Sequence, residues 1–193
     1  MRRIAAALAL LLVLSGCGGT ETEAETLLER FAAMEGCAME ARVKCEYEGE
    51  LRAYTLRCDY AAQGESRVTV LEPEALAGLS AIFDGESCTL CYEELVLDAG
   101  TLGESALSPA EVLPCLMGAL RTGWLLERSR EEDADGTLTR LTLETEENGV
   151  KHDWTVWLRE DGTPAAAETT VKEKLIFRME FTSFSFGAIL NAE

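Results

Sequence analysis

The sequence predicts an α+β fold: a curled antiparallel β-sheet, or half-barrel, of about ten strands, with an N-terminal helix and one or two inserted lid helices. Apolar and polar residues alternate in short segments along most of the chain, which is typical of strands with one solvated face. The dipeptides Asp135-Gly136, Asn148-Gly149 and Asp161-Gly162 separate the later segments and favour tight hairpins. A sheet this wide with one apolar face must curl, and only the helices can cover its concave side.

The N-terminus has the features of an export signal. Arg2 and Arg3 precede eleven consecutive apolar residues at 4–14, about half of what a membrane-spanning helix needs. The tetrapeptide that ends in Cys17, Leu-Ser-Gly-Cys, resembles the lipobox of bacterial lipoproteins. That resemblance implies removal of residues 1–16 and attachment of a diacylglycerol to the Cys17 sulfur. We therefore expect a signal peptide at 1–16, a lipidated cysteine and short tether at 17–25, and a single domain at 26–193.

The charge of the chain narrows the range of partners. The full sequence has 17 basic and 35 acidic side chains, and cleavage after residue 16 removes two basic residues and no acidic ones. An acidic surface repels nucleic-acid phosphates and anionic lipid headgroups. We therefore expect no nucleic-acid partner. The covalent lipid on Cys17 is expected to be the only contact with the membrane, and it would hold the protein on the extracytoplasmic side of the cell membrane.

The first elements follow from changes in hydrophobic period. Leu27, Leu28, Phe31 and Met34 recur at helical spacing and predict a helix over 22–35. Period-two alternation over 37–47 and 53–60, with a turn at 48–50, then predicts a long antiparallel hairpin. Further strands are predicted at 67–72, 81–83, 88–92 and 94–97, with a short helix opened by Pro73.

A second helix divides the sheet into two halves. Ser108 and Glu111 have the spacing of a capping box, Pro109 suits the first turn, and Gly123 marks the end, so this helix should run to about residue 121. Beyond it, strands are predicted at 124–130, 137–144, 150–159, 165–173 and 175–186.

Four local patterns, taken with this order of elements, resemble a known family. They are a helix that ends in Leu28, Phe31 and Met34, Val70-Leu71-Glu72-Pro73 leading to Leu79, Ser108-Pro109 with Leu113-Pro114, and Trp157-Leu158 before Asp161-Gly162-Thr163-Pro164. The chain resembles the family of the lipoprotein carrier LolA, its receptor LolB and the sensor RseB. The resemblance implies a half-barrel whose helical lid encloses an apolar cavity for a lipid, a lipoprotein acyl chain or another hydrophobic ligand. The apolar positions expected to line it are Met39, Val43, Tyr54, Leu56, Leu90, Leu113, Leu116, Leu120, Trp154, Val156, Met179 and Phe181.

A second interpretation stays open. The same apolar residues could form a filled core, and the protein would then be an envelope interaction or stress-sensing module that contacts another envelope protein. Its contact surface would be an exposed aromatic patch with Trp154, Trp157 and the C-terminal strand as candidates. We expect no enzyme and no cofactor, because signatures of serine nucleophiles, phosphate loops and calcium loops are missing.

Six cysteines follow Cys17, an even number that suggests disulfides outside the cytoplasm. The predicted first hairpin places Cys37 and Cys58 close together on one face, which makes them a possible disulfide; the other pairings stay open, and some cysteines could be buried thiols. Cys88 and Cys91 have redox spacing, but in a strand they point to opposite faces. His152 and a single Cys-x-x-Cys do not make a zinc site, so no metal is expected, and His152 is expected to face solvent.

Overall fold

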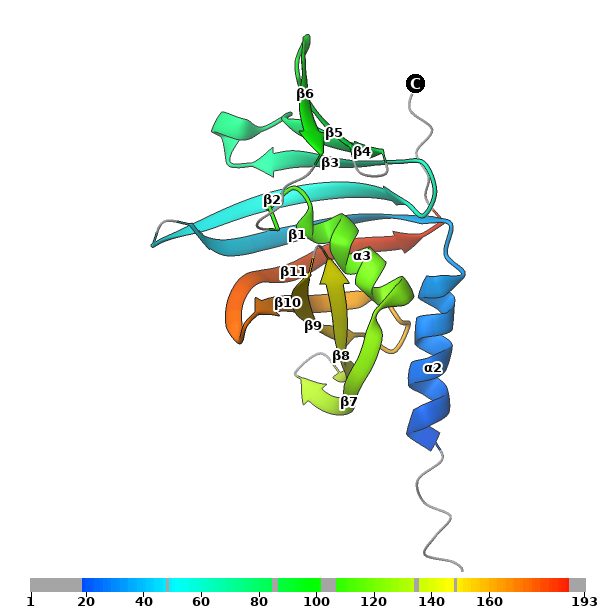
Figure 1. The fold of residues 1–193 in the computed structure, drawn as a ribbon. Coiled ribbons are helices and arrows are strands. Elements are labelled where there is room, and N and C mark those ends of the chain that lie inside the picture. The colour runs from blue at the N-terminus through cyan, green and yellow to red at the C-terminus, as the bar shows by residue number, and fades with distance from the viewer. Residues whose placement is uncertain are drawn as a thin grey trace, which may run out of the picture.

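The computed structural model describes residues 19–47, 49–84, 87–101, 107–133, 136–147 and 149–187 of the chain. These residues form one sheet of eleven strands together with two α-helices and one short 3₁₀ helix (Figure 1). In chain order the elements are α2 (Gly19–Ala32), β1 (Gly36–Tyr47), β2 (Glu50–Ala61), β3 (Glu65–Glu72), η1 (Glu74–Leu76), β4 (Ser80–Asp84), β5 (Ser87–Tyr92), β6 (Leu95–Thr101), α3 (Val112–Thr122), β7 (Trp124–Asp133), β8 (Gly136–Glu147), β9 (Val150–Leu158), β10 (Pro164–Val171) and β11 (Lys174–Phe186).

The sheet is antiparallel throughout and remains open. Its strand order is β6-β5-β4-β3-β2-β1-β11-β10-β9-β8-β7, so the first and last strands of the chain pair at the centre while β6 and β7 form the two edges. The sheet curls around α3, which packs against β2, β8 and α2 (Figure 1). The predicted α+β half-barrel is therefore confirmed, with eleven strands in place of about ten.

The two helices begin and end for identifiable reasons. α2 ends three residues earlier than predicted, because the Met34 amide bonds the Phe31 carbonyl at 3.1 Å and tightens the turn into β1. The predicted capping box before α3 is present. The Ser108 amide donates to the Glu111 carboxylate at 2.8 Å, and the Glu111 amide donates to the Ser108 hydroxyl at 3.3 Å. Gly123 ends α3, with its amide bonded to the Ala119 carbonyl.

The core lies on the concave face of the sheet. Alternate residues of β1, β2, β8, β9 and β11 point inward and pack against six buried residues of α3. None of the described helices is long and apolar enough to cross a membrane. Cys17 and residues 1–18, which include the predicted signal peptide, lie outside the described residues.

Candidate functional site

The residues expected to line a cavity all face the concave side of the sheet or come from α3. Ten of the twelve are buried, from Leu113 and Val156 with no exposed surface to Phe181 at 6%, whereas Tyr54 and Leu90 are half-buried. A side chain with no accessible surface adjoins neither solvent nor a void that could hold a water molecule. An acyl chain could therefore reach the deepest of these residues only if α3 moved away from the sheet.

The concave face carries exposed apolar side chains where β5 turns into β6. Register shows which side chains meet there. Leu90 pairs with Leu97 and Tyr92 with Leu95, so these four share a face with Ala81, which pairs with Leu90. Tyr54 pairs with the inward-facing Val43 of β1, and Val70 pairs with the inward-facing Leu56 of β2, so both also face the concave side. We call this set the apolar mouth: Tyr54, Val70, Leu90, Tyr92, Leu95 and Leu97.

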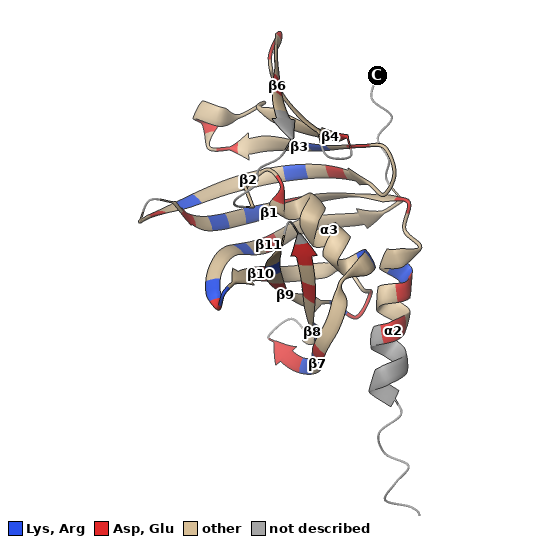
Figure 2. Cartoon of the chain, in the orientation of Figure 1, with Lys and Arg blue, Asp and Glu red and all other residues tan. Residues whose placement is uncertain are grey.

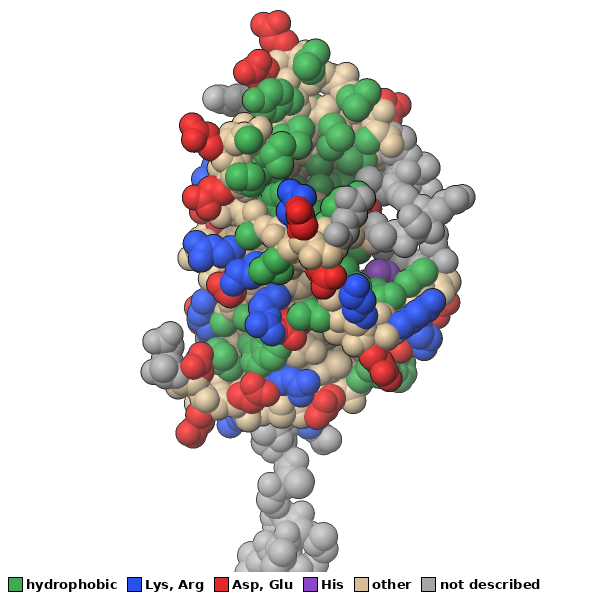
Figure 3. Space-filling model, turned by 90° about the vertical axis from the view of Figure 1, so that its left-hand side faces the viewer, with side chains coloured by type: hydrophobic (Ala, Val, Ile, Leu, Met, Phe, Trp, Pro, Cys, Tyr) green, Lys and Arg blue, Asp and Glu red, His purple; other side chains and the backbone are tan. Residues whose placement is uncertain are grey.

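The apolar mouth is open to solvent. Leu95 is 72% exposed, Leu97 64% and Tyr92 40%. Figure 3 views this end of the molecule and shows hydrophobic side chains gathered around a hollow in its upper half, where β3–β6 lie. Sequence reasoning named Tyr54 and Leu90 but missed Leu95 and Leu97. The pairing of β6 with β5 was the missing information, because it brings these leucines onto the face of Leu90.

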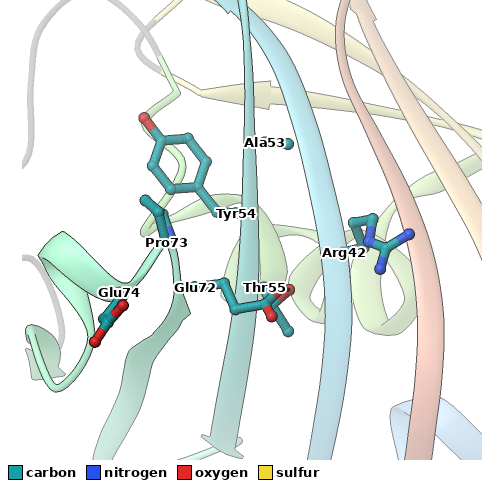
Figure 4. Close-up of a pocket in the computed structure, with 7 residues that line it drawn as sticks. All are labelled: Arg42, Ala53, Tyr54, Thr55, Glu72, Pro73 and Glu74. Atoms are coloured by element: carbon teal, nitrogen blue, oxygen red, sulfur yellow. Dashed lines mark hydrogen bonds between the residues drawn. The ribbon is translucent and has the colours of Figure 1, made fainter.

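A pocket of mixed character lies at Tyr54. It has a volume of about 310 Å³ and is lined by Arg42, Ala53, Tyr54, Thr55, Glu72, Pro73 and Glu74 (Figure 4). The Thr55 hydroxyl donates to Glu72 Oε2 at 2.6 Å. Its lining combines charged side chains with Ala53, Tyr54 and Pro73, so it does not favour either a polar or an apolar occupant. Sequence reasoning did not predict this pocket.

Polar atoms are buried at the start of β9. His152 is only 8% exposed, so the expectation that it faces solvent is wrong. The period of β9 places His152 on the concave face with Trp154 and Val156, and its ring stacks on Trp154 at 6.4 Å between centroids. Trp154 is 1% exposed and donates from Nε1 to Thr145 Oγ1 at 2.9 Å, so it cannot belong to an exposed aromatic patch.

Burial raises the pKa of four thiols in the described strands, those of Cys37, Cys45, Cys58 and Cys88. Cys37 and Cys58 lie diagonally on one face of the β1–β2 hairpin, as predicted, and both are free thiols in this structure. Burial, reinforced by the charge of Asp59, raises the pKa of Cys37 to about 12. Burial also raises the pKa of Cys88, which is buried while Cys91 is half-buried, as expected for opposite faces of a strand. A neutral thiol is a poor nucleophile and metal ligand.

No group of three or more metal-binding side chains occurs within the part of the chain that the structure describes. The concave surface is apolar, with α3 packed against its buried part and with exposed leucines at β6.

Comparisons with known proteins bear on the fold of this chain and not on its function. The chain matches no family model and no curated protein. It is similar in structure to an uncharacterized conserved protein from Thermus thermophilus, with 10% identity over 86% of this chain and 87% of that one and a TM-score of 0.50.

Two other solved structures match this chain with TM-scores below 0.5. One is a putative outer membrane lipoprotein-sorting protein domain from Vibrio parahaemolyticus, with 9% identity, coverage of 88% and 93%, and a TM-score of 0.49. The other is a LolA superfamily protein from Nitrosomonas europaea, with 11% identity, coverage of 84% and 92%, and a TM-score of 0.45. The LolA family to which the sequence shows a resemblance is thus among the structural neighbours.

Proposed function

We propose that this protein is a non-enzymatic, extracytoplasmic lipoprotein, held at the membrane by a lipid on Cys17, that binds a lipid, an acyl chain or another hydrophobic ligand at the apolar mouth. The observation that carries the proposal is the open end of the concave face. Leu90, Tyr92, Leu95 and Leu97 present adjoining apolar surface there, beyond the reach of α3. Contiguous exposed apolar surface on a folded protein marks a place where something binds.

The mouth could hold a chain at its entrance without rearrangement of the core. Covering one exposed leucine contributes about 1.5–3 kcal/mol, so Leu95 and Leu97 together would contribute about 3–6 kcal/mol before the cost of association. Deeper entry would follow the concave face toward Leu56 and Val156, which are closed off in this structure.

The tight burial of the predicted cavity residues favours a second function. A domain with a filled core would use its exposed surface to contact an envelope protein and would bind no lipid. The two functions differ in whether the purified protein carries a bound lipid.

Native mass spectrometry of the exported Cys17→Ala protein, followed by solvent extraction, separates them. A stoichiometric lipid, or uptake of a fluorescent fatty acid by the apo protein, is expected if the mouth binds hydrophobic ligands. A clean apo mass with no uptake would refute the lipid proposal and leave the interaction module.

Variants at the mouth test the location of the site. Leu95 and Leu97 are suitable because they are 72% and 64% exposed, whereas an aspartate at Leu56 would unfold the core. We expect Leu95→Asp with Leu97→Asp to weaken fatty-acid uptake by at least about tenfold at an unchanged urea midpoint. The matched control is Leu126→Asp on β7, where a leucine that is 52% exposed lies outside the mouth. Equal uptake by all three proteins would place the ligand elsewhere.

Membrane attachment needs a separate test. An alkyne-tagged fatty acid fed to the producing cells is expected to label the parent protein, and Cys17→Ala is expected to abolish that label. Labelling that persists in the variant would refute attachment through Cys17.

A further inference from the structure

The edge strand β6 has an unusual composition for its position. It ends the strand order, and within the described part of the chain no strand lies beyond it, so the outer row of its backbone N–H and C=O groups is not paired in the sheet. Leu95, Val96 and Leu97 are 72%, 71% and 64% exposed. Because successive residues alternate in direction, apolar side chains cover both faces of the strand.

Edge strands normally carry features that prevent pairing with another chain. The opposite edge of this sheet carries them: six of the ten residues of β7 are charged, and Glu127 is tied to Arg140 of β8 at 3.3 Å. β6 has one charged residue in seven and neither proline nor lysine. The charges on β7 therefore oppose pairing with a strand of another chain, whereas β6 carries only one charge.

The surroundings of β6 are uniformly acidic. Residues 68–120 contain nine acidic side chains and no Lys, Arg or His. Glu93 and Glu94 form the β5–β6 turn, and Asp98 lies within β6. Figure 2 shows this part of the sheet with acidic positions along β3–β6 and basic colour only on β3, where Arg67 precedes the stretch.

We propose that β6 is a docking site for an extended segment of a partner protein, which adds to the sheet as a twelfth strand. The segment carries apolar residues in alternation with Lys or Arg. Its backbone pairs with the outer edge of β6 and its apolar side chains cover Leu95 and Leu97 on one face of the strand. Its cations then lie on the other face, which carries Glu94, Val96 and Asp98.

The acidic charge around β6 opposes two other occupants of this edge, a second copy of the chain and an anionic membrane surface. If two copies paired in antiparallel fashion about Val96, Glu94 of one copy would lie opposite Asp98 of the other, and like charges directly opposite are destabilising. The net charge of −18 on each chain opposes such a dimer further. An anionic membrane surface is repelled for the same reason. A basic, apolar strand is the occupant that satisfies both the edge and its acidic borders.

Strand addition shares Leu95 and Leu97 with the apolar mouth, but it can be tested at a residue outside the mouth. Val96 pairs with Cys91 and points to the outer face, away from Leu90 and Leu97. A change at Val96 therefore tests the strand and leaves the mouth unaltered.

The test uses a short peptide in which Lys and Val alternate, added to the exported Cys17→Ala protein. We expect binding together with slower amide hydrogen exchange at residues 95–98. The same peptide with consecutive N-methylated amides keeps every side chain and charge but cannot donate backbone hydrogen bonds to β6. Its affinity should fall by at least about tenfold, which corresponds to the loss of two or three hydrogen bonds.

Val96→Lys should weaken binding of the unmodified peptide by about the same factor. Leu126→Lys on β7 is the matched control and should leave it unchanged. Both side chains are more than half exposed, so both variants should keep the urea midpoint of the parent protein.

Three results would overturn the proposal. Equal binding by the N-methylated peptide would show charge attraction without strand addition. Equal binding by the Val96→Lys protein would place the peptide elsewhere. A concentration-dependent dimer of the unliganded protein that Val96→Lys abolishes would identify a second copy as the occupant of the edge.

Discussion

The packing of α2 against the barrel makes a quantitative prediction for Phe31→Ala. Phe31 has no exposed surface. The centroid of its ring lies 5.4 Å from the ring centroid of Phe186 and 6.3 Å from that of Phe184. The Arg30 guanidinium stacks 3.7 Å from the Phe186 ring centre, and its Nη1 donates to the Asp161 carbonyl at 2.6 Å. Phe31 is thus the centre of the contact that joins α2 to the sheet.

Removal of this ring is expected to cost about 3–5 kcal/mol of unfolding free energy, toward the upper value because two ring pairs are lost with the buried area. Domains of this size have roughly 5–15 kcal/mol in total, so the variant would retain a reduced margin. At a urea dependence of about 2 kcal/mol per molar, the midpoint should fall by about 2 M. Tryptophan fluorescence during urea titration measures this directly.

Glu29→Ala is the control, since Glu29 is exposed on the same helix and its loss should change stability by less than about 0.5 kcal/mol. If Phe31→Ala cost under about 1 kcal/mol, α2 would not be packed on the sheet in solution, and the reasoning about its role would be wrong.

Three further predictions follow from single contacts. Gly162 has a φ of +80° and a Cβ there would lie 2.9 Å from Leu27 of α2, so Gly162→Ala should lower unfolding free energy by about 1–2 kcal/mol in urea titration; an unchanged midpoint would contradict this contact. Thr145→Val leaves the buried Trp154 Nε1 without its acceptor and should cost about 1–3 kcal/mol, and less in a Trp154→Phe background; equal costs in both would exclude the hydrogen bond. The Cys37 thiol has a pKa of about 12 in the folded protein, so between pH 9 and 12 it ionises mainly in the unfolded chain and the free energy of unfolding falls as pH rises. Under reducing conditions, Cys37→Ala should make this fall less steep by about 1 kcal/mol per pH unit between pH 9 and 10.5, and should leave the slope below pH 8 unchanged. Equal slopes for the variant and the parent protein at every pH would refute the raised pKa.

The fold could be predicted from sequence because its local signals agree. The capping box of Ser108 and Glu111, the stop at Gly123 and the period-two segments each reappear in the structure at or near the predicted residues. Period two also identified the inward-facing side of the strands. Its one clear failure is His152, where a polar residue near a turn was assigned to solvent although the alternation of β9 places it inside.

The state of the cavity could not be predicted in the same way. Alternation identifies Val43, Leu56 and Val156 as inward-facing, but it carries no information on how tightly the sheet curls around α3. That depends on packing between segments far apart in the chain. The apolar mouth was missed in part for the related reason that β6 is apolar on both faces, so its alternation does not indicate which side joins the concave surface.

The position of α2 relates the proposed anchor to the two proposed binding surfaces. In the sequence, Gly18 alone separates Cys17 from the first residue of α2. A helix of 14 residues is about 21 Å long, so a lipid on Cys17 would hold the domain close to the membrane. The N-terminal end of α2 lies toward β7 and β8, whereas β5 and β6 lie at the opposite end of the molecule (Figure 1). An anchored molecule would therefore turn β6 away from the bilayer. This placement favours a protein strand over lipid headgroups as the occupant of that edge, and it leaves the apolar mouth, which opens to the side, able to receive a ligand without release of the anchor.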